Sequence, residues 1–332
     1  MKKSLLILAL TAFVNAANAI EANTVEIIYN GTTATVNIAS NISNYVTVLS
    51  ANSSHVKIVQ DAAFAGVDKT TDNEDGEIIY SLSGTSTDGE FYMEGGYKAT
   101  VELNGVTLTN PSGPALNIQD GKRIVISAKK NTISTLTDGA NEEYNGCIHC
   151  KGHTKMKGKG ILNVVGNSKH AVYSKEYLEI KNLTLNVNSA LKDGIHCKDY
   201  FLMESGTVKV SGAQDDGIQV ELGSGTITDI TTDHEDENTG NFYMAGGVLT
   251  IENYVGKAIK ADGTIKYTGG TRNYNTDDTE IQASISSTNM AVANSKDAVY
   301  DMNGRRVSAN TNLRKGLYVV NRNGRMVKVQ CK

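Results

Sequence analysis

A five-residue phrase recurs through the middle of this chain at nearly constant spacing, and no other feature limits the fold as strongly. Its copies occupy residues 147–151, 171–175, 194–198, 217–221 and 258–262. Equivalent positions in the first four copies are 24, 23 and 23 residues apart. Self-similarity with a period of twenty-odd residues is typical of a solenoid, in which each repeat forms one coil and stacks on the next.

Each copy alternates with period two, which predicts a β-strand. One set of positions holds small or apolar side chains that suit an interior: Ile148, Val172, Ile195, Ile218, Ile259 and Cys150, Ser174, Cys197, Val220, Ala261. Two further strand-like runs complete each coil, for example residues 177–180 and 183–187. Three short strands per coil and no helical periodicity predict an all-β chain built as a parallel β-helix, with coils about 4.8 Å apart.

The rest of the chain divides around this helix. Residues 1–19 carry a charged start at Lys2 and Lys3, an apolar run at 5–14 and an A-x-A site at 17–19, as in a cleaved secretory signal peptide. We therefore expect a secreted or cell-surface protein. We expect an N-terminal cap with degenerate coils at 20–85, the regular β-helix at 86–275, a polar linker at 276–295 and a small C-terminal β module at 296–332. No later segment is long and apolar enough for a transmembrane helix.

The charge distribution bears on possible partners. Two of the 32 lysines and arginines lie in residues 1–19, which leaves 30 against 36 acidic residues and argues against nucleic acid. Residues 146–209 hold ten lysines and five acidic residues, whereas residues 210–240 hold eight acidic residues and no Lys or Arg. A basic stretch beside an acidic one suits a polyanionic ligand next to a cation site. Scattered solvating charge is the alternative explanation.

The outward positions of the repeated strand form the candidate ligand-binding strip. They are His149, Tyr173, His196 and Gln219, with Lys151, Lys175 and Lys198 beside them. Ring faces, imidazole groups and hydroxyls suit sugars, and lysines meet carboxylates as point charges. A uronic-acid chain presents a carboxylate every 4–5 Å, which is close to the coil spacing of about 4.8 Å. The alternative is that outward residues are polar simply because they face water, with Lys protecting the sheet.

Two Asp-Gly corners form the candidate metal site. Asp193 and Asp216 are expected on adjacent coils, about 5 Å apart, where a hard cation such as Ca²⁺ would relieve their repulsion. Asp215, Asp199 and Glu221 are expected near enough to add oxygen ligands. The acidic runs 72–75 and 233–236 are weaker candidates because they lack the spacing of an EF-hand loop. The alternative is that Asp-Gly is only a favourable turn dipeptide.

Two of the cysteines, Cys150 and Cys197, are expected to be small core residues. Cys150 and Cys197 lie in one inward row but two coils apart, about 9.5 Å, beyond the limit of about 7 Å for the Cα atoms of a disulfide. Cys147 and Cys150 form a C-x-x-C pair close to His149 and His153, but positions three apart on a strand face opposite sides, so we do not expect zinc or redox chemistry there.

Several segments outside the core repeat carry a family resemblance. Residues 80–84, 89–91, 97–99, 103–106, 121–124 and the repeated Asp-Gly-Ile resemble the exported carbohydrate-binding β-helix family of clostridia and Bacteroidetes. The resemblance implies a right-handed β-helix shaped like pectate lyases, bound calcium, and binding of polygalacturonate or cellulose-like glycans without established cleavage.

The C-terminal residues carry a second resemblance. Residues 298–307 and 315–329, with Asn-Gly turns, resemble the C-terminal sorting domain of the type IX secretion pathway, which implies that the secretion machinery is a partner.

The favoured function is therefore calcium-dependent, non-catalytic binding of an acidic polysaccharide, with no catalytic residue assigned. One alternative is a pectate-lyase-like enzyme acting on uronans. Against it, residues 124–271 contain no arginine, which is the usual base of those lyases, and the motifs of polygalacturonases are absent. The second alternative is a surface scaffold or adhesin.

Overall fold

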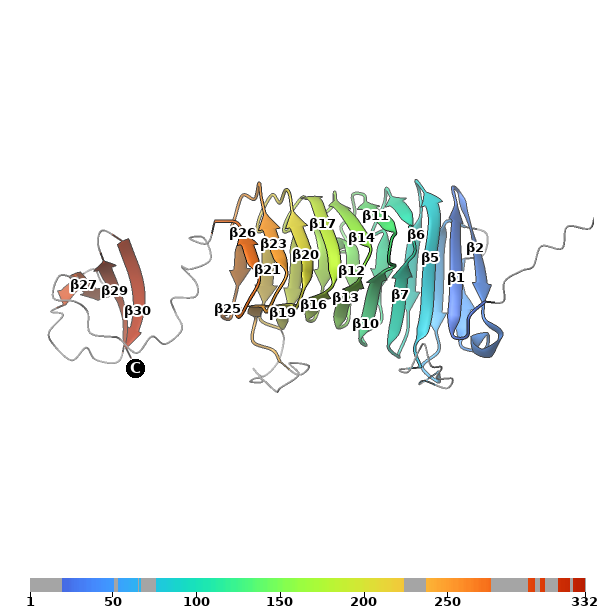
Figure 1. Cartoon of the computed structure of the whole chain (residues 1–332), viewed down its shortest axis with the longest axis horizontal. Helices are drawn as coiled ribbons and strands as arrows, with labels where there is room; N and C mark the ends of the chain where they lie inside the picture. The colour runs from blue at the N-terminus through green and yellow to red at the C-terminus, as the bar shows by residue number, and fades with distance from the viewer. Residues whose placement is uncertain are drawn as a thin grey trace, which may run out of the picture.

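The computed structural model describes 20–50, 53–64, 66, 76–223, 237–275, 298–301, 305–307, 316–322 and 325–331. These residues form a stack of β coils and a small separate sheet (Figure 1). The only helical segment among them is the 3₁₀ helix η1, Ser40–Ile42. No helix in this described part of the chain is long and apolar enough to cross a bilayer. The predicted signal peptide lies outside the described residues.

One face of the coil stack is a nine-stranded sheet that contains the repeated phrase. Its strands are β3 Val46–Val48, β4 His55–Gln60, β6 Glu90–Glu94, β9 Leu116–Ile118, β12 Gly146–Cys150, β15 His170–Ser174, β18 Ile195–Lys198, β21 Ile218–Glu221 and β24 Ile259–Ala261. From β4 onward all pairings in this sheet are parallel. We call it the repeat sheet.

The other two faces come from the second and third strand of each coil. The second strands are β7 Ala99–Leu103, β10 Ile124–Ala128, β13 Thr154–Gly158, β16 Leu178–Lys181, β19 Tyr200–Met203, β22 Asn241–Met244 and β25 Ile265–Tyr267. The third strands are β8 Thr107–Asn110, β11 Ile133–Asp138, β14 Ile161–Gly166, β17 Leu183–Ala190, β20 Gly206–Val210, β23 Val248–Ile251 and β26 Thr271–Asn273. The chain from β6 to β26 thus runs through successive three-strand coils, and the prediction of a parallel β-helix is confirmed.

The register between coils follows the sequence repeat. Ile148 pairs with Val172, Val172 with Ile195, and Ile195 with Ile218, so residues one period apart are neighbours. All four are fully buried. The same rule stacks Phe201 on Phe242 in the core, with ring centroids 5.0 Å apart and planes 5° apart. Stacked rows of apolar side chains therefore fill the interior continuously.

Cys150 and Cys197 are core residues, as expected. Cys147, Cys150 and Cys197 are free and buried. Burial raises the pKa of the Cys150 thiol to about 12, so it remains protonated at neutral pH. Cys147 is buried as well, although a strict alternation would turn it outward, and the equivalent residues Ala171 and Ala258 are buried too.

The two ends of the chain differ from the regular coils. The strands β1, Thr24–Asn30, and β2, Thr33–Ile38, form an antiparallel hairpin, and β1 pairs in parallel with β5, Ile78–Ser86. This hairpin extends the stack at its N-terminal end, and β2 covers an edge of β1 that would otherwise be unpaired. The C-terminal strands β27 Ala298–Asp301, β28 Arg306–Val307, β29 Gly316–Arg322 and β30 Arg325–Cys331 form an antiparallel sheet. The predicted linker lies outside the described residues.

The stacked phenylalanines provide a test of the core. Phe201→Ala should lower the free energy of unfolding by about 3–5 kcal/mol, because it removes a fully buried ring and leaves a cavity beside Phe242. Leu191→Ala is the control, since Leu191 is 56% exposed and its truncation should cost under about 0.5 kcal/mol. Urea unfolding followed by circular dichroism measures both. Equal losses for the two variants would contradict this account of the core.

Candidate functional site

The outward positions of the repeat sheet form one row along the coils. The parallel register places Lys57, Tyr92, Asn117, His149, Tyr173, His196, Gln219 and Lys260 in this order, one residue per coil. The predicted strip of His149, Tyr173, His196 and Gln219 lies at its centre. The structure therefore brings these four residues together as the repeat predicted.

Three rings of this row cover one another. The ring centroids of His149 and Tyr173 are 5.2 Å apart with an angle of 15° between the planes, and those of Tyr173 and His196 are 5.4 Å apart at 30°. A coil repeat of about 4.8 Å brings outward rings on successive coils to stacking distance. Tyr173 is only 8% exposed as a result. Contrary to expectation, Tyr173 cannot offer a ring face to a sugar, because a histidine stacks on each face.

His149 is held in its neutral form within this stack. Its Nδ1 lies 3.2 Å from the backbone nitrogen of Asn145 and accepts a hydrogen bond from that N–H. Burial, with a smaller contribution from the charge of Lys169, lowers the pKa of His149 to about 4. The imidazole is therefore uncharged at neutral pH, and the positive charge of this face comes from lysines.

Lysines follow the outward row on one side. Lys151 and Lys175 are exposed, and within the described part of the chain neither has an assigned ion pair. The next position in this row is Lys198, whose Nζ lies 3.3 Å from the carboxylate of Glu221. Glu221 also accepts a hydrogen bond of 3.1 Å from the amide of Gln219. Two of the three predicted lysines thus keep their charge available to a ligand, and Lys198 is partly neutralised.

The aspartates of the Asp-Gly corners lie on adjacent coils and bind the backbone in sequence. Asp193 Oδ1 accepts a 3.0 Å hydrogen bond from the backbone N–H of Asp216. Asp216 Oδ1 accepts one of 2.7 Å from the N–H of Lys257 on the following coil. Each carboxylate therefore ties its own coil to the next. We call this succession of carboxylates the aspartate row.

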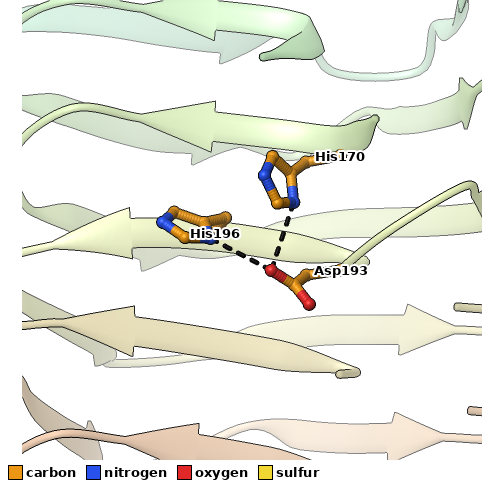
Figure 2. A group of neighbouring side chains, drawn as sticks. All are labelled: His170, Asp193 and His196. Atoms are coloured by element: carbon orange, nitrogen blue, oxygen red, sulfur yellow. Dashed lines mark hydrogen bonds and ion pairs between the residues drawn. The ribbon is translucent and has the colours of Figure 1, made fainter. Parts of the chain in front are cut away.

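Neighbouring cations and imidazoles offset the negative charge of the aspartate row. Asp193 Oδ2 lies 3.0 Å from Nδ1 of His196 and 3.2 Å from Nδ1 of His170 (Figure 2). Burial alone would raise the pKa of Asp193, but its interactions with these two histidines outweigh burial and hold the pKa well below its usual range. Asp216 Oδ2 lies 3.2 Å from Nζ of Lys260. The chain thus supplies its own partners for both carboxylates.

A third carboxylate joins the two aspartates. Single ligand atoms of Asp193, Asp215 and Asp216 all lie within 4.8 Å of one another, and Asp215 is exposed. Gly256 lies close to two of these carboxylates, and a Cβ there would lie 2.4 Å from Oδ1 of Asp216 and 2.9 Å from Oδ1 of Asp215. Three carboxylates with ligand atoms this close together suit a hard cation that prefers oxygen ligands.

The other two predicted metal ligands lie outside this group. Asp193 precedes β18 and Asp199 follows it, so about 20 Å of extended chain separates their backbones. Asp199 occupies a turn with φ of 60°, and burial with the charge of Glu176 raises its pKa to about 6. Glu221 ends β21 and contacts Lys198, Gln219 and His196 instead. The acidic runs 72–75 and 233–236 lie outside the described residues.

Sequence reasoning missed one residue of this site, His170. It lies two positions before Val172, just as Asp193 lies two before Ile195, so it occupies the same row one coil earlier. A comparison of equivalent positions across the repeat contained this signal.

Sequence reasoning also missed a second stack of rings. The ring centroid of Tyr177 lies 4.8 Å from that of Tyr200 and 4.4 Å from that of His153.

The lowered pKa of His149 predicts a loss of stability in acid. An unfolded histidine takes up a proton near pH 6.5, whereas folded His149 does so only near pH 4. The contribution of neutral His149 to the free energy of unfolding is therefore complete above pH 6.5. It is lost as the pH falls toward 4, and the free energy of unfolding decreases by up to about 3 kcal/mol. His149→Gln should flatten the dependence of Tm on pH in this window. NMR titration of the histidine ring protons gives the pKa directly, and an ordinary value for His149 would contradict the prediction.

Comparisons with known proteins agree with this architecture. A carbohydrate-binding domain-containing protein of Acetivibrio thermocellus is 26% identical over 121 residues, which are 33% of this chain and 42% of that relative, so the chain spans less than half of the relative's length. The structure of the polysaccharide lyase-like protein from C. thermocellum, a gadolinium derivative, has the same fold with a TM-score of 0.56 at 19% identity, covering 75% of this chain and 99% of that one. The model of the carbohydrate-binding domain-containing protein family matches residues 68–314, and the chain belongs to this family.

Proposed function

We propose that this protein binds an acidic polysaccharide of the polygalacturonate type along the outward row of the repeat sheet, with Ca²⁺ held by the aspartate row, and does not cleave it. Membership of a carbohydrate-binding family supports a polysaccharide partner. The proposal that this polysaccharide is acidic rests mainly on one observation. Lys151 and Lys175 are exposed on adjacent coils beside the stacked rings.

The spacing of these lysines supports an anionic chain as the ligand. Adjacent coils lie about 4.8 Å apart, close to the distance between successive carboxylates of a uronan. Each ammonium group can therefore meet one carboxylate of an extended chain that runs along the stack. His149 and Tyr173 each lie two residues before one of these lysines, on the same face of the repeat sheet. A neutral, cellulose-like glycan would make no use of the lysine charges.

Calcium fits the group of Asp193, Asp215 and Asp216. Ca²⁺ takes six to eight oxygen ligands, so three carboxylates would leave positions for water or for a carboxylate of the glycan. A cation shared between the protein and a uronate would add affinity where the lysines end and the acidic stretch begins. Asp215 is best placed for this role, because its side chain is exposed, whereas Asp193 and Asp216 are tied to the backbone.

A lyase on the same fold is the second candidate. The fold neighbour is described as polysaccharide lyase-like, but a likeness at 19% identity concerns the fold alone. A lyase needs a base close to the proton that it removes. Lys175 and Lys198 are the nearest candidates on this face, and no arginine occurs between 124 and 271. Absorbance of unsaturated uronates after incubation with pectate and Ca²⁺ would reveal cleavage and overturn the non-catalytic proposal. A protein that neither binds nor cleaves would be a surface scaffold or adhesin.

Export is part of the proposal. A signal peptide at 1–19 and a C-terminal sheet whose sequence resembles a type IX sorting domain suit a secreted or cell-surface protein of a Bacteroidetes-like cell. A polysaccharide ligand outside the cell suits that location. Fractionation of cells expressing the full chain tests it, and retention in the cytoplasm would contradict it.

The lysine contribution can be tested with a matched pair of variants. Lys151→Gln with Lys175→Gln should weaken polygalacturonate binding about fivefold or more, because it removes two exposed charges that each contribute up to about 1 kcal/mol. Lys157 and Lys181 are an aligned pair on adjacent coils of another face, so their double Gln variant is the control and should bind normally. Isothermal titration at low salt measures both. Equal affinities for the two double variants would exclude the repeat sheet as the binding face.

The calcium contribution predicts a requirement for metal. Polygalacturonate binding should fall at least about tenfold when Ca²⁺ is removed with a chelator, and Asp215→Asn should have a similar effect in the presence of Ca²⁺. Glu142→Gln changes an exposed carboxylate away from the aspartate row and is the control. Affinity electrophoresis in pectate gels with and without Ca²⁺ provides the measurement. Binding that persists unchanged in chelator would refute calcium dependence while leaving the lysine test intact.

A further inference from the structure

Two histidines and one aspartate converge at the edge of the outward row. His170 and Asp193 occupy the same position on adjacent coils, at or just before the first residue of β15 and β18, and His196 lies within β18. Figure 2 shows both imidazoles turned toward the same carboxylate oxygen. The side chains of Asp193, His196 and His170 are 2%, 8% and 9% exposed, so all three are at least nine-tenths buried. The outward row proposed for glycan binding includes His196, but neither earlier proposal uses the two imidazoles as metal ligands.

The distances between these atoms match the edges of a tetrahedral coordination site. Zinc–nitrogen and zinc–oxygen bonds of about 2.0–2.1 Å place tetrahedral ligand atoms about 3.3–3.4 Å apart. Asp193 Oδ2 lies 3.0 Å from His196 Nδ1 and 3.2 Å from His170 Nδ1. One ligand atom from each of the three residues lies within 4.8 Å of the others. These separations are close to those of ligand atoms around one ion.

The hydrogen bonds of the group leave one nitrogen atom short of a partner. Nδ1 of His196 bonds to Asp193 Oδ2, whereas the buried Nδ1 of His170 faces the same oxygen but has no partner in hydrogen-bonding geometry among the residues that the structure describes. An unpaired buried nitrogen is costly. A metal ion between the nitrogen and the carboxylate would satisfy the lone pairs of both.

The groups that contact the three side chains resemble those that orient the ligands in known metal sites. Ligating histidines commonly direct their second ring nitrogen to a carboxylate, which fixes the tautomer. Nε2 of His196 lies 3.5 Å from Oε2 of Glu221, so a proton on Nε2 would leave Nδ1 free to bind a metal. The backbone N–H of Asp216 holds the other oxygen of Asp193. Both ligands are thus oriented by residues of the following coil.

We propose that His170, Asp193 and His196 bind a divalent first-row transition metal ion, with Zn²⁺ as the best fit. Two imidazoles and one carboxylate suit zinc and its neighbours, with a fourth position for water, whereas Ca²⁺ requires an oxygen-rich shell. The ion would clamp two adjacent coils at the end of the ring stack, since Tyr173 stacks against both histidines. The site shares only Asp193 with the proposed calcium group.

The test uses the full chain, stripped of metal with a chelator and titrated calorimetrically with Zn²⁺. The wild type should bind one ion per chain, and His170→Gln and His196→Gln should each weaken that binding by about 100-fold. His149→Gln is the matched control and should bind as the wild type does, because His149 belongs to the same ring stack but not to the triad. Bound Co²⁺ should show the intense visible absorption of a tetrahedral site, and excess Ca²⁺ should not displace it.

Either of two results would overturn the zinc proposal. Absence of Zn²⁺ binding by the wild type would overturn the proposal and leave the triad as a hydrogen-bonded charge cluster. Zn²⁺ binding that survives in both histidine variants would place the ion elsewhere, for example at the cysteines, and would also overturn it. Both variants keep Asp193 and its bond to Asp216, and thermal melts in chelator verify that they fold. Glycan retention without zinc is measured separately, so failure of this proposal is distinguishable from failure of the carbohydrate proposal.

Discussion

Parallel backbone hydrogen bonding between coils is the interaction on which the rest of this structure depends. It repeats at about 4.8 Å and keeps equivalent residues of successive coils in register. Side chains that are 23 or 24 residues apart therefore become direct neighbours. Isoleucine stacks on valine, histidine on tyrosine and aspartate on aspartate. A slip of one residue would turn each of these rows to the opposite face of the sheet, so the buried rows strongly specify the register.

The same stacking brings like charges together, and the structure shows how this chain tolerates them. Each carboxylate of the aspartate row accepts a backbone N–H from the following coil, while histidines or Lys260 approach its second oxygen. The row is therefore compatible with folding before any metal binds. The proposed Ca²⁺ would take part in glycan binding, and the proposed Zn²⁺ would link two adjacent coils. This differs from small zinc domains, where the metal is required for folding.

The fold could be predicted because a solenoid converts sequence spacing directly into spatial neighbourhood. The inward rows of Ile148 and Cys150, the outward row of His149 and the adjacency of Asp193 and Asp216 all follow from the period. Three features of the site did not follow. The ring faces of Tyr173 are covered by its neighbours, Asp199 and Glu221 lie at the far ends of their strands, and His170 joins Asp193. The first two depend on side-chain rotamers and strand length. The position of His170 in the row of Asp193 follows from the repeat, but the direction of its imidazole depends on a rotamer, which the period leaves open.

By itself, the sequence determined the stack of coils, the inward and outward sense of most repeated positions, and the order of residues along each row, because alternation and period are properties of the chain alone. Only the tertiary structure decided which outward side chains remain accessible. Lys151 and Lys175 are exposed at the surface, whereas Tyr173, His170 and His196 pack against one another and, through the two histidines, against Asp193. The physical reason is that side-chain packing between coils depends on rotamers and neighbouring rows, which no single repeat contains.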